Sequence, residues 1–336
     1  MNLAEAVYQH FYWRRKRQAE SARAVFSQTH VISVGNITTG GTGKTPAVQW
    51  LARRLQNAGV KTVIIARGYG GAHSAQGAIV SDGKKILLNA RQAGDEAVLH
   101  ARALPSTPVL IGRDRIKATR IALEKFAPQI ILLDDGFQYW SLARDFDLVL
   151  LDARRPFENG KLLPVGRLRE PKSELGRADG VLLTRSDRAS DSELKRTLDE
   201  VRILTDAPIF QSSHAPIYLR NEAGGEQIEL QKLHQQPIAV LSALANNENF
   251  HQSLKACGAN VICALAKSDH HSWQQKEVRS FAREAKAKGA QFLVTTEKDA
   301  VKLDSHWSDL PLWSLVIELQ IENEDELWKL ISKRIL

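Results

Sequence analysis

Residues 31–46 read VISVGNITTGGTGKTP, and they contain the strongest structural signal of the chain. The run Val31–Val34 is mostly apolar and β-branched, as expected of a buried strand. A glycine-rich segment follows, and an amphipathic helix is expected from Pro46 until Gly59 ends it. A strand, a glycine-rich loop and a helix in this order predict a phosphate-binding loop.

The residues of this loop are the expected phosphate ligands: Thr38, Thr39, Gly40, Gly41, Thr42, Gly43, Lys44 and Thr45. Glycines let the backbone amides curl around phosphate oxygens. Lys44 adds a positive charge at the β and γ phosphates, and Thr45 offers a hydroxyl to Mg²⁺. The general pattern has glycine where this chain has Thr38. The loop predicts binding of ATP with Mg²⁺, and the alternative is an ordinary glycine turn.

Two acidic residues, Asp134 and Asp135, directly follow the apolar run Ile130–Leu133. In open α/β sheets, ligands bind at the carboxyl ends of strands, so acids at this position face a bound nucleotide and are suited to hold Mg²⁺. An Asp-Asp-Gly turn without a ligand is the alternative. The phosphate loop in the same chain favours the metal site.

Short apolar runs alternate with amphipathic segments from Val31 onward, which predicts βα units around a mostly parallel sheet. The runs are nearly continuous in apolar residues, as strands covered on both faces require. The fold class predicted is therefore α/β, with a mostly parallel sheet like that of P-loop NTPases. The expected strands are Val31–Val34, Thr62–Ala66, Val109–Ile111, Ile130–Leu133, Leu148–Leu151 and Val181–Leu183.

The composition is that of a folded globular protein, with 43% hydrophobic and 25% charged residues. Basic residues exceed acidic ones by 46 to 38, which gives a net charge of +8 and suits a polyanionic partner. Zinc-finger spacings and RNA-recognition signatures are absent from the sequence, so no nucleic-acid partner is expected. No apolar run reaches the roughly 18 residues that a membrane-spanning helix needs.

The first residues have the pattern of a helix that lies on a membrane surface. Leu3, Val7 and Phe11 recur at helical spacing, and the basic run 14–17 follows them. A helix docked on its own domain is the alternative, and these residues do not decide between the two.

The chain length of 336 residues exceeds the usual size of one domain, about 100–200 residues. A polar segment with a Gly224-Gly225 turn separates the first series of βα units from a second, shorter one, and we expect a linker there in the form of a β-ribbon. The expected divisions are a membrane-surface helix over 1–27, a P-loop nucleotide-binding lobe over 28–212, the linker over 213–236 and a second, smaller α/β lobe over 237–336.

Two further groups of polar residues lie where predicted helices begin. Asp95 and Glu96 open one helix, and Asp269 and His270 precede another. Acids at these positions are ordinary N-cap and first-turn residues, so local sequence alone favours a capping role. A catalytic role for either group depends on resemblance to a family.

Six segments together resemble the tetraacyldisaccharide 4'-kinases in order and spacing: 34–36, 40–46, 67–71, 94–96, 134–138 and 296–302. The resemblance implies transfer of the γ-phosphate of ATP, with Mg²⁺, to the 4'-hydroxyl of an acylated glucosamine disaccharide 1-phosphate in lipid A biosynthesis. It also implies two P-loop-like lobes joined by a ribbon. The location implied is peripheral, at the cytoplasmic face of the inner membrane of a Gram-negative bacterium.

The same resemblance implies catalytic roles for individual residues. Asp95 is similar to the family's catalytic base, and His270 to the histidine of the second lobe that is paired with it. Lys44 is expected to act on the phosphates. The other positions that resemble family site residues are the metal and nucleotide ligands Thr45, Glu96, Asp134 and Asp135, and a further polar pair near the phosphates, Arg169 and Glu170.

The chain departs from the family pattern at several places. Tyr139 stands where the family usually has histidine, and Ala243–Asn247 replace a Gly-Ile-Gly-Asn-Pro stretch. The rival reading is a soluble P-loop ligase or transferase that acts on a small metabolite. Such an enzyme would share the loop and the acids, but it would need no N-terminal segment facing a membrane.

Overall fold

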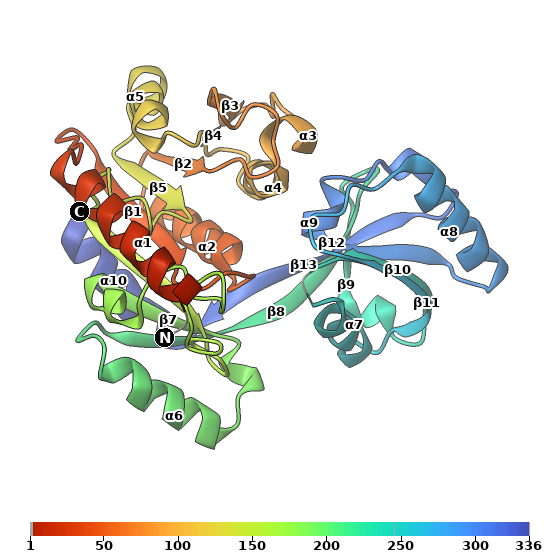
Figure 1. Ribbon diagram of the computed structural model, residues 1–336. Coiled ribbons are helices and arrows are strands. Elements are labelled where there is room, and N and C mark those ends of the chain that lie inside the picture. The colour runs from red at the N-terminus through yellow and green to blue at the C-terminus, as the bar shows by residue number, and fades with distance from the viewer. Residues whose placement is uncertain (1–2, 245, 336) are drawn as a thin grey trace. The chain divides into compact units, whose positions relative to one another are not determined.

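The computed structural model describes residues 3–244 and 246–335. The chain forms two compact units, which Figure 1 draws as ribbons. The strands β8 (Ile209–Asn221) and β13 (Leu312–Ile321) each pass from one unit into the other. The first unit comprises Met1–Leu88, Gln92–His214 and Leu319–Leu336, and the second comprises Asn89–Arg91 and Ala215–Glu318.

The first unit is built on a sheet with the strand order β8-β7-β6-β1-β5-β2-β4-β3. Neighbouring strands are parallel from β8 to β4, and β3 pairs antiparallel with β4. The strands predicted from the sequence lie in β1, β2, β4, β5, β6 and β7, so these predictions are confirmed. The bounds are β1 (His30–Asn36), β2 (Thr62–Ala66), β3 (Ala78–Ser81), β4 (Val109–Ile111), β5 (Ile130–Asp134), β6 (Phe146–Asp152) and β7 (Gly180–Thr184).

Both faces of this sheet are covered. Side chains alternate between the two faces along a strand, and consecutive residues such as Val31 and Ile32 are both buried. Helices α2 and α4 pack against β1, β2, β4 and β5, while α5 and α6 contribute to hydrophobic clusters with the strands. The helices outside residues 215–318 are α1 (Leu3–Ser21), α2 (Lys44–Asn57), α3 (Ala90–Ala93), α4 (Asp95–Ala103), α5 (Arg115–Phe126), α6 (Asp191–Arg202) and α10 (Glu324–Ile335), with the 3₁₀ helices η1 (Lys172–Arg177) and η2 (Ser186–Arg188).

Local sequence explains several helix ends. The Asp114 side chain accepts a hydrogen bond from the Lys117 amide and so caps α5. Ser190 and Glu193 form a capping box at the start of α6. After α2, Gly59 adopts a φ of 74°, a left-handed conformation that glycine takes without strain, and this supports the predicted end of the helix.

The second unit contains the parallel strands β11, β10, β12 and β13, in that order. The short strand β9 pairs antiparallel with the end of β8, which makes a ribbon within the segment predicted as a linker. The elements are β9 (Gln227–Glu229), β10 (Pro237–Ala243), β11 (Asn260–Lys267), β12 (Phe292–Thr296), α7 (Asn247–Ala256), α8 (Gln275–Ala287), α9 (Glu297–Ala300), η3 (Leu230–Leu233) and η4 (Ser305–Trp307).

The C-terminal helix α10 differs from expectation, because it belongs to the first unit and not to the lobe predicted over 237–336. Trp50 Nε1 of α2 donates a hydrogen bond of 2.9 Å to Glu324, and Arg54 pairs with Asp325 at 3.0 Å. The apolar side chains of Leu327 and Ile331 are fully buried. The amphipathic pattern of this helix predicts its formation, but it does not specify which core receives the apolar face.

Helix α1 is docked on the first unit through Tyr8, Tyr12 and Lys16, the last two of which are buried. The side chains of Leu3, Val7 and Phe11 are exposed. One part of the helix surface is therefore docked on the first unit, and another part exposes apolar side chains. Within residues 3–244 and 246–335, no helix combines the length and the apolar character needed to cross a membrane.

Candidate functional site

The predicted phosphate loop connects the end of β1 to the start of α2. Its glycines are needed for conformation and for space: Gly40 and Gly43 have φ values of 120° and 84°, and a β-carbon on Gly43 would lie 2.8 Å from the ring of His214. Lys44 Nζ donates to Asn36 Oδ1 at 3.4 Å. Among the described residues, the buried atoms Thr42 Oγ1 and Asn36 Nδ2 have no hydrogen-bond partner. These features fit a loop that a ligand completes.

The loop is held in place from outside by two other segments. The Thr39 amide donates to the carbonyl of Arg167 at 2.8 Å, and the Arg169 amide donates to the carbonyl of Ile37, also at 2.8 Å. From the end of β7, Arg185 donates to the Gly41 carbonyl at 2.6 Å and pairs with Asp152 at 2.7 Å. These contacts attach the loop to the segment 167–169 and to the end of β7.

His214 is a neighbour of the loop that sequence reasoning missed. Burial, together with the charges of Arg185 and Arg188, lowers the pKa of His214 to about 4. The imidazole is therefore neutral near pH 7, and it adds no charge beside Gly43. His214 lies in the segment 213–236 that was predicted as a linker, and a lone histidine there gives no signal that would have identified it.

Asp135 joins the phosphate loop to Arg169. Arg169 Nη1 donates to both carboxylate oxygens of Asp135, at 2.8 and 2.7 Å, and Lys44 Nζ lies 3.7 Å from Oδ1. Burial opposes ionisation of this carboxyl, but Lys44 and Arg169 outweigh it and hold its pKa below the usual value. Asp135 is therefore an anion among cations at the carboxyl end of β5.

Asp134 has a different environment, although it is the adjacent residue. Its Oδ2 lies 2.9 Å from Nε2 of His100, and both side chains are buried. Arg115, also buried, donates to the Asp134 carbonyl at 3.4 Å. His100 lies on α4, so this contact ties α4 to the end of β5. The sequence did not identify His100, because a histidine within a helix has no distinctive pattern.

Asp95 and Glu96 form the first turn of α4, and Asp95 is 6% exposed. Gly94 precedes them with a φ of 86°, and a β-carbon there would lie 2.5 Å from the carbonyl oxygen of Tyr69. Helical rise is about 1.5 Å per residue, so Asp95 lies about 7.5 Å along the axis from His100. Because His100 contacts Asp134, helix α4 lies beside the edge where β5 ends.

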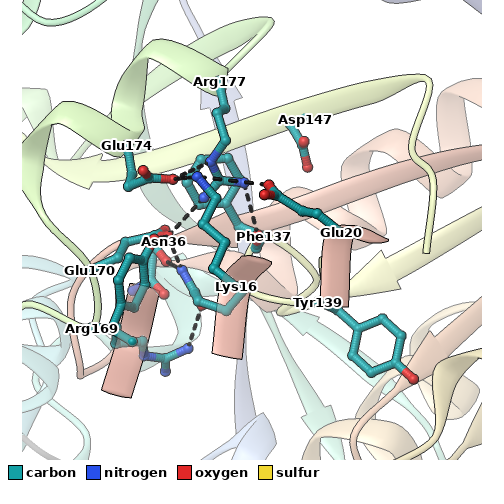
Figure 2. A network of polar contacts seen from close by, with 12 residues as sticks. Lys16, Glu20, Asn36, Phe137, Tyr139, Asp147, Arg169, Glu170, Glu174 and Arg177 are labelled. Carbon is teal, nitrogen blue, oxygen red and sulfur yellow. Dashed lines mark hydrogen bonds and ion pairs between the residues drawn. The ribbon is translucent and has the colours of Figure 1, made fainter. Parts of the chain in front are cut away.

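Arg169 and Glu170 are adjacent, but Figure 2 shows that they take part in different contacts of one polar network. Arg169 reaches Asp135, whereas Glu170 is fully buried and accepts hydrogen bonds from Tyr12 at 3.0 Å, Gln138 at 2.7 Å and Arg177 at 2.7 Å. Burial raises the pKa of Glu170 to about 7, although Arg177 and these donors oppose the rise.

Tyr139, at the position where the family resemblance expects histidine, contacts the start of α5. Its hydroxyl accepts from the Arg115 amide at 3.0 Å and donates to Asp114 at 3.3 Å. The Arg115 guanidinium lies 5.6 Å from the centre of the Tyr139 ring. These contacts give Tyr139 a structural role in this chain.

The predicted residues of the second unit lie between β11 and α8. Asp269 pairs with Lys298 at 2.9 Å, and His271 contacts Glu277 at 2.9 Å. His270 adopts a φ of 61°, and its Nε2 lies 3.7 Å from an oxygen of Asp269. His270 belongs to the second unit and Asp95 to the first.

A magnesium ion would need oxygens from the nucleotide as well as from the protein. The described part of the chain has no group of three or more His, Cys, Asp or Glu side chains that would hold a metal. Mg²⁺ in kinase sites is usually bound by one or two carboxylates together with substrate phosphates. Asp134 and Asp135 at the end of β5 and Thr45 at the start of α2 carry oxygen donors of the kind that this ligand set requires.

Comparisons with known proteins support this reading. A sequence profile described as tetraacyldisaccharide-1-P 4'-kinase matches residues 1–336. The tetraacyldisaccharide 4'-kinase of Syntrophus aciditrophicus is 40% identical over 311 residues, which cover 90% of this chain and 83% of that protein. The enzyme of Geobacter sulfurreducens is 39% identical over 311 residues, with coverage of 91% and 85%.

A solved structure is similar over its whole length. The crystal structure of LpxK from Aquifex aeolicus in complex with ATP matches with a TM-score of 0.79 and 29% identity, and the match covers 99% of this chain and 97% of that one. The predicted α/β fold of the P-loop type is thereby confirmed. The chain, matched along its entire length by the profile and along most of it by named relatives, belongs to the tetraacyldisaccharide 4'-kinase family.

Proposed function

We propose that this chain transfers the γ-phosphate of ATP to the 4'-hydroxyl of tetraacyldisaccharide 1-phosphate, with Mg²⁺, at the cytoplasmic surface of a bacterial inner membrane. Membership of the family makes the chain an ATP-dependent kinase of lipid A biosynthesis. The observation that carries the proposal is the phosphate loop at the end of β1, where Lys44 lies 3.7 Å from Asp135. The small-metabolite reading is not favoured, because the named relatives act on a lipid.

In this proposal the phosphate loop binds the triphosphate. Amides of residues 40–45 surround the phosphate oxygens, and Lys44 neutralises charge on the β and γ phosphates. Thr45, Glu96, Asp134 and Asp135 would hold Mg²⁺, which supplies further positive charge to the phosphates. Arg169 keeps Asp135 in position through its two hydrogen bonds. Positioning and electrostatic stabilisation provide most of the acceleration.

Asp95 is proposed as the general base, with His270 of the second unit as its partner. The carboxylate accepts the proton of the sugar 4'-hydroxyl while that oxygen bonds to the γ-phosphorus. The bond from the γ-phosphorus to the bridging oxygen breaks, and ADP leaves. The small exposed fraction of Asp95 and its place in the first turn of α4 support this role, because a helix N-terminus favours an anion.

Helix α1 is proposed to contact the membrane. Leu3 is 80% exposed, Val7 47% and Phe11 60%, and their spacing of four residues places them on one side of the helix. Arg14, Arg15 and Arg17 are exposed as well, which suits anionic head groups. An acylated acceptor lies in a membrane, so an enzyme held at its surface meets the acceptor directly.

The test is to offer labelled ATP and the acylated disaccharide 1-phosphate to the purified chain and to look for a bisphosphorylated lipid. The product is expected with wild type, and it should form about 10²–10³-fold more slowly with Lys44→Ala. A folded wild-type chain that binds ATP but makes no such lipid would contradict the proposal. Activity on a water-soluble acceptor, undiminished by Leu3→Ser, Val7→Ser and Phe11→Ser together, would favour the small-metabolite reading.

A further inference from the structure

Helix α1 uses one side for contact with the rest of the first unit, and the contacting residues repeat every four positions. Tyr8 donates to the Arg169 carbonyl at 2.7 Å, Tyr12 to Glu170 at 3.0 Å and Lys16 to Glu174 at 2.6 Å. Tyr12 and Lys16 are buried at 6% and 9% exposure. Residues four apart lie on the same side of a helix, so these three form a single docking surface.

A continuous chain of hydrogen bonds, with an ion pair as its last link, leads from this docking surface to the phosphate loop. Glu170 accepts from Tyr12 through Oε2 and from Gln138 through Oε1. Gln138 in turn accepts from Arg169 at 3.3 Å, and it donates to the Asn36 carbonyl at 2.8 Å. Arg169 binds Asp135, which lies beside Lys44. Each link is a contact between neighbouring polar groups, so no long-range effect needs to be assumed.

Two buried acids and two cations stand at the centre of this chain, and Figure 2 shows them close together. Arg177 donates to Glu170 at 2.7 Å and to Glu174 at 2.6 Å, and Lys16 also binds Glu174. The Arg177 guanidinium lies 4.0 Å from the centre of the Phe137 ring. Phe137 follows Asp135 by two positions in the sequence. Removal of one cation would leave the two buried acids with a single cation, which favours movement of the neighbouring groups.

We propose that Tyr12 and Lys16 are positioning residues for the nucleotide site, which act through Glu170 and Glu174 on Arg169 and Gln138. Helix α1 is then part of the ATP site as well as the proposed membrane contact. The inference rests on the proposed function for the identity of the nucleotide. It predicts that the phosphate loop is fully ordered for ATP only while α1 is docked.

The test uses the full chain without lipid and measures the affinity for a fluorescent ATP analogue with Mg²⁺. Tyr12→Phe removes one hydroxyl, and Lys16→Met removes one charge at similar length. Each is expected to weaken binding about threefold to tenfold, the range of couplings within one hydrogen-bond network. The KM for ATP should rise more than kcat falls. The loop binds the nucleotide both before transfer and in the transition state, so weaker binding affects the two states alike.

Glu20→Gln is the matched control on the same helix. The Glu20 side chain is 44% exposed and reaches the cluster through Lys16, at 3.7 Å. Exposed ion pairs contribute little, so analogue affinity should equal that of wild type. The melting temperature of each variant is measured alongside, since a purely structural role would lower it and leave the affinity of the folded protein unchanged.

A double-mutant cycle decides whether the effect passes through Arg169. If it does, Tyr12→Phe weakens analogue binding in wild type but has little further effect in Arg169→Ala. Unchanged affinity in both Tyr12→Phe and Lys16→Met, or full additivity with Arg169→Ala, would overturn the inference. Analogue binding does not require the lipid acceptor, so a failure here is distinct from a failure to phosphorylate the lipid.

Discussion

The phosphate-loop region of the first unit and the region around Asp299 in the second unit both place charged residues just after a strand, but they use them differently. In the first, Lys44, Asp135 and Arg169 form ion pairs, and each remains partly accessible at its side chain. In the second, Asp299 is fully buried. Accessibility, and not the mere presence of charge, separates a site that handles a ligand from one that holds loops together.

The contacts of Asp299 explain its burial. It accepts hydrogen bonds from the Ala243 amide at 2.9 Å, from Trp273 Nε1 at 3.1 Å and from Thr296 Oγ1 at 2.9 Å. Lys302 Nζ lies 2.8 Å from Oδ1 of Asp299, the oxygen that also accepts from Trp273. Substitutions in the first region should therefore affect activity more than stability, and those in the Asp299 region should do the reverse.

The largest effect is expected for Asp95→Ala. Loss of general-base assistance should lower turnover by about 10²–10⁴-fold, while ATP binding is retained. Initial rates and titration with an ATP analogue measure the two quantities. Asp199→Ala, an exposed position on α6, serves as the control. Near-normal turnover of Asp95→Ala would reject Asp95 as the base.

Lys44→Ala is expected to lower turnover by about 10²–10³-fold, because a positioned charge on the phosphates is lost. Stability should change little, since Arg169 continues to pair with Asp135. Lys61→Ala is the control, as Lys61 is exposed. A large fall in the melting temperature with little effect on turnover would mean that Lys44 stabilises the fold and does not serve the reaction.

Asp299→Asn should lower the free energy of unfolding by about 3 kcal/mol, because buried donors and Lys302 lose a charged acceptor. Affinity for an ATP analogue should not change. Urea unfolding followed by circular dichroism measures the first quantity, and Asp309→Asn, at an exposed position, is the control. A stable variant with impaired catalysis would mean that Asp299 serves the reaction directly.

The smallest effect concerns Glu170, which is buried like Asp299 but belongs to the first region. Its pKa is raised by burial from 4.5 to about 7, so the folded protein binds a proton there that the unfolded chain releases. Stability should therefore fall as the pH rises between these values, and Glu170→Gln should show a smaller fall. Urea unfolding at several pH values tests this, and identical pH profiles would disprove it.

The sequence predicted those parts of the fold that local patterns determine. The strands around Val31, Thr62 and Ile130 are continuous apolar runs, because both sides of the sheet are covered, and they were found where expected. The phosphate loop could be recognised because a glycine-rich loop that ends in Lys-Thr, between a strand and a helix, is specific to phosphate binding. The sequence alone thus predicted that Lys44 and Asp135 lie at the same edge of the sheet.

Other parts of the site depend on contacts between residues far apart in sequence. Arg185 meets Gly41, and Tyr12 meets Glu170, across separations of 144 and 158 residues. His100 pairs with Asp134 from within a helix whose pattern is ordinary. Helix α10 packs in the first unit, although it follows the strands of the second in sequence. No local periodicity encodes these partners.

A crystal structure of this chain with a non-hydrolysable ATP analogue and Mg²⁺ tests the central claim most directly. We expect the triphosphate on the amides around Gly43, with its γ-phosphate within hydrogen-bond reach, about 3 Å, of Lys44 Nζ, and with Asp95 facing the same phosphate. A triphosphate bound elsewhere, or an Asp95 side chain turned away from the γ-phosphate in every copy, would contradict the account.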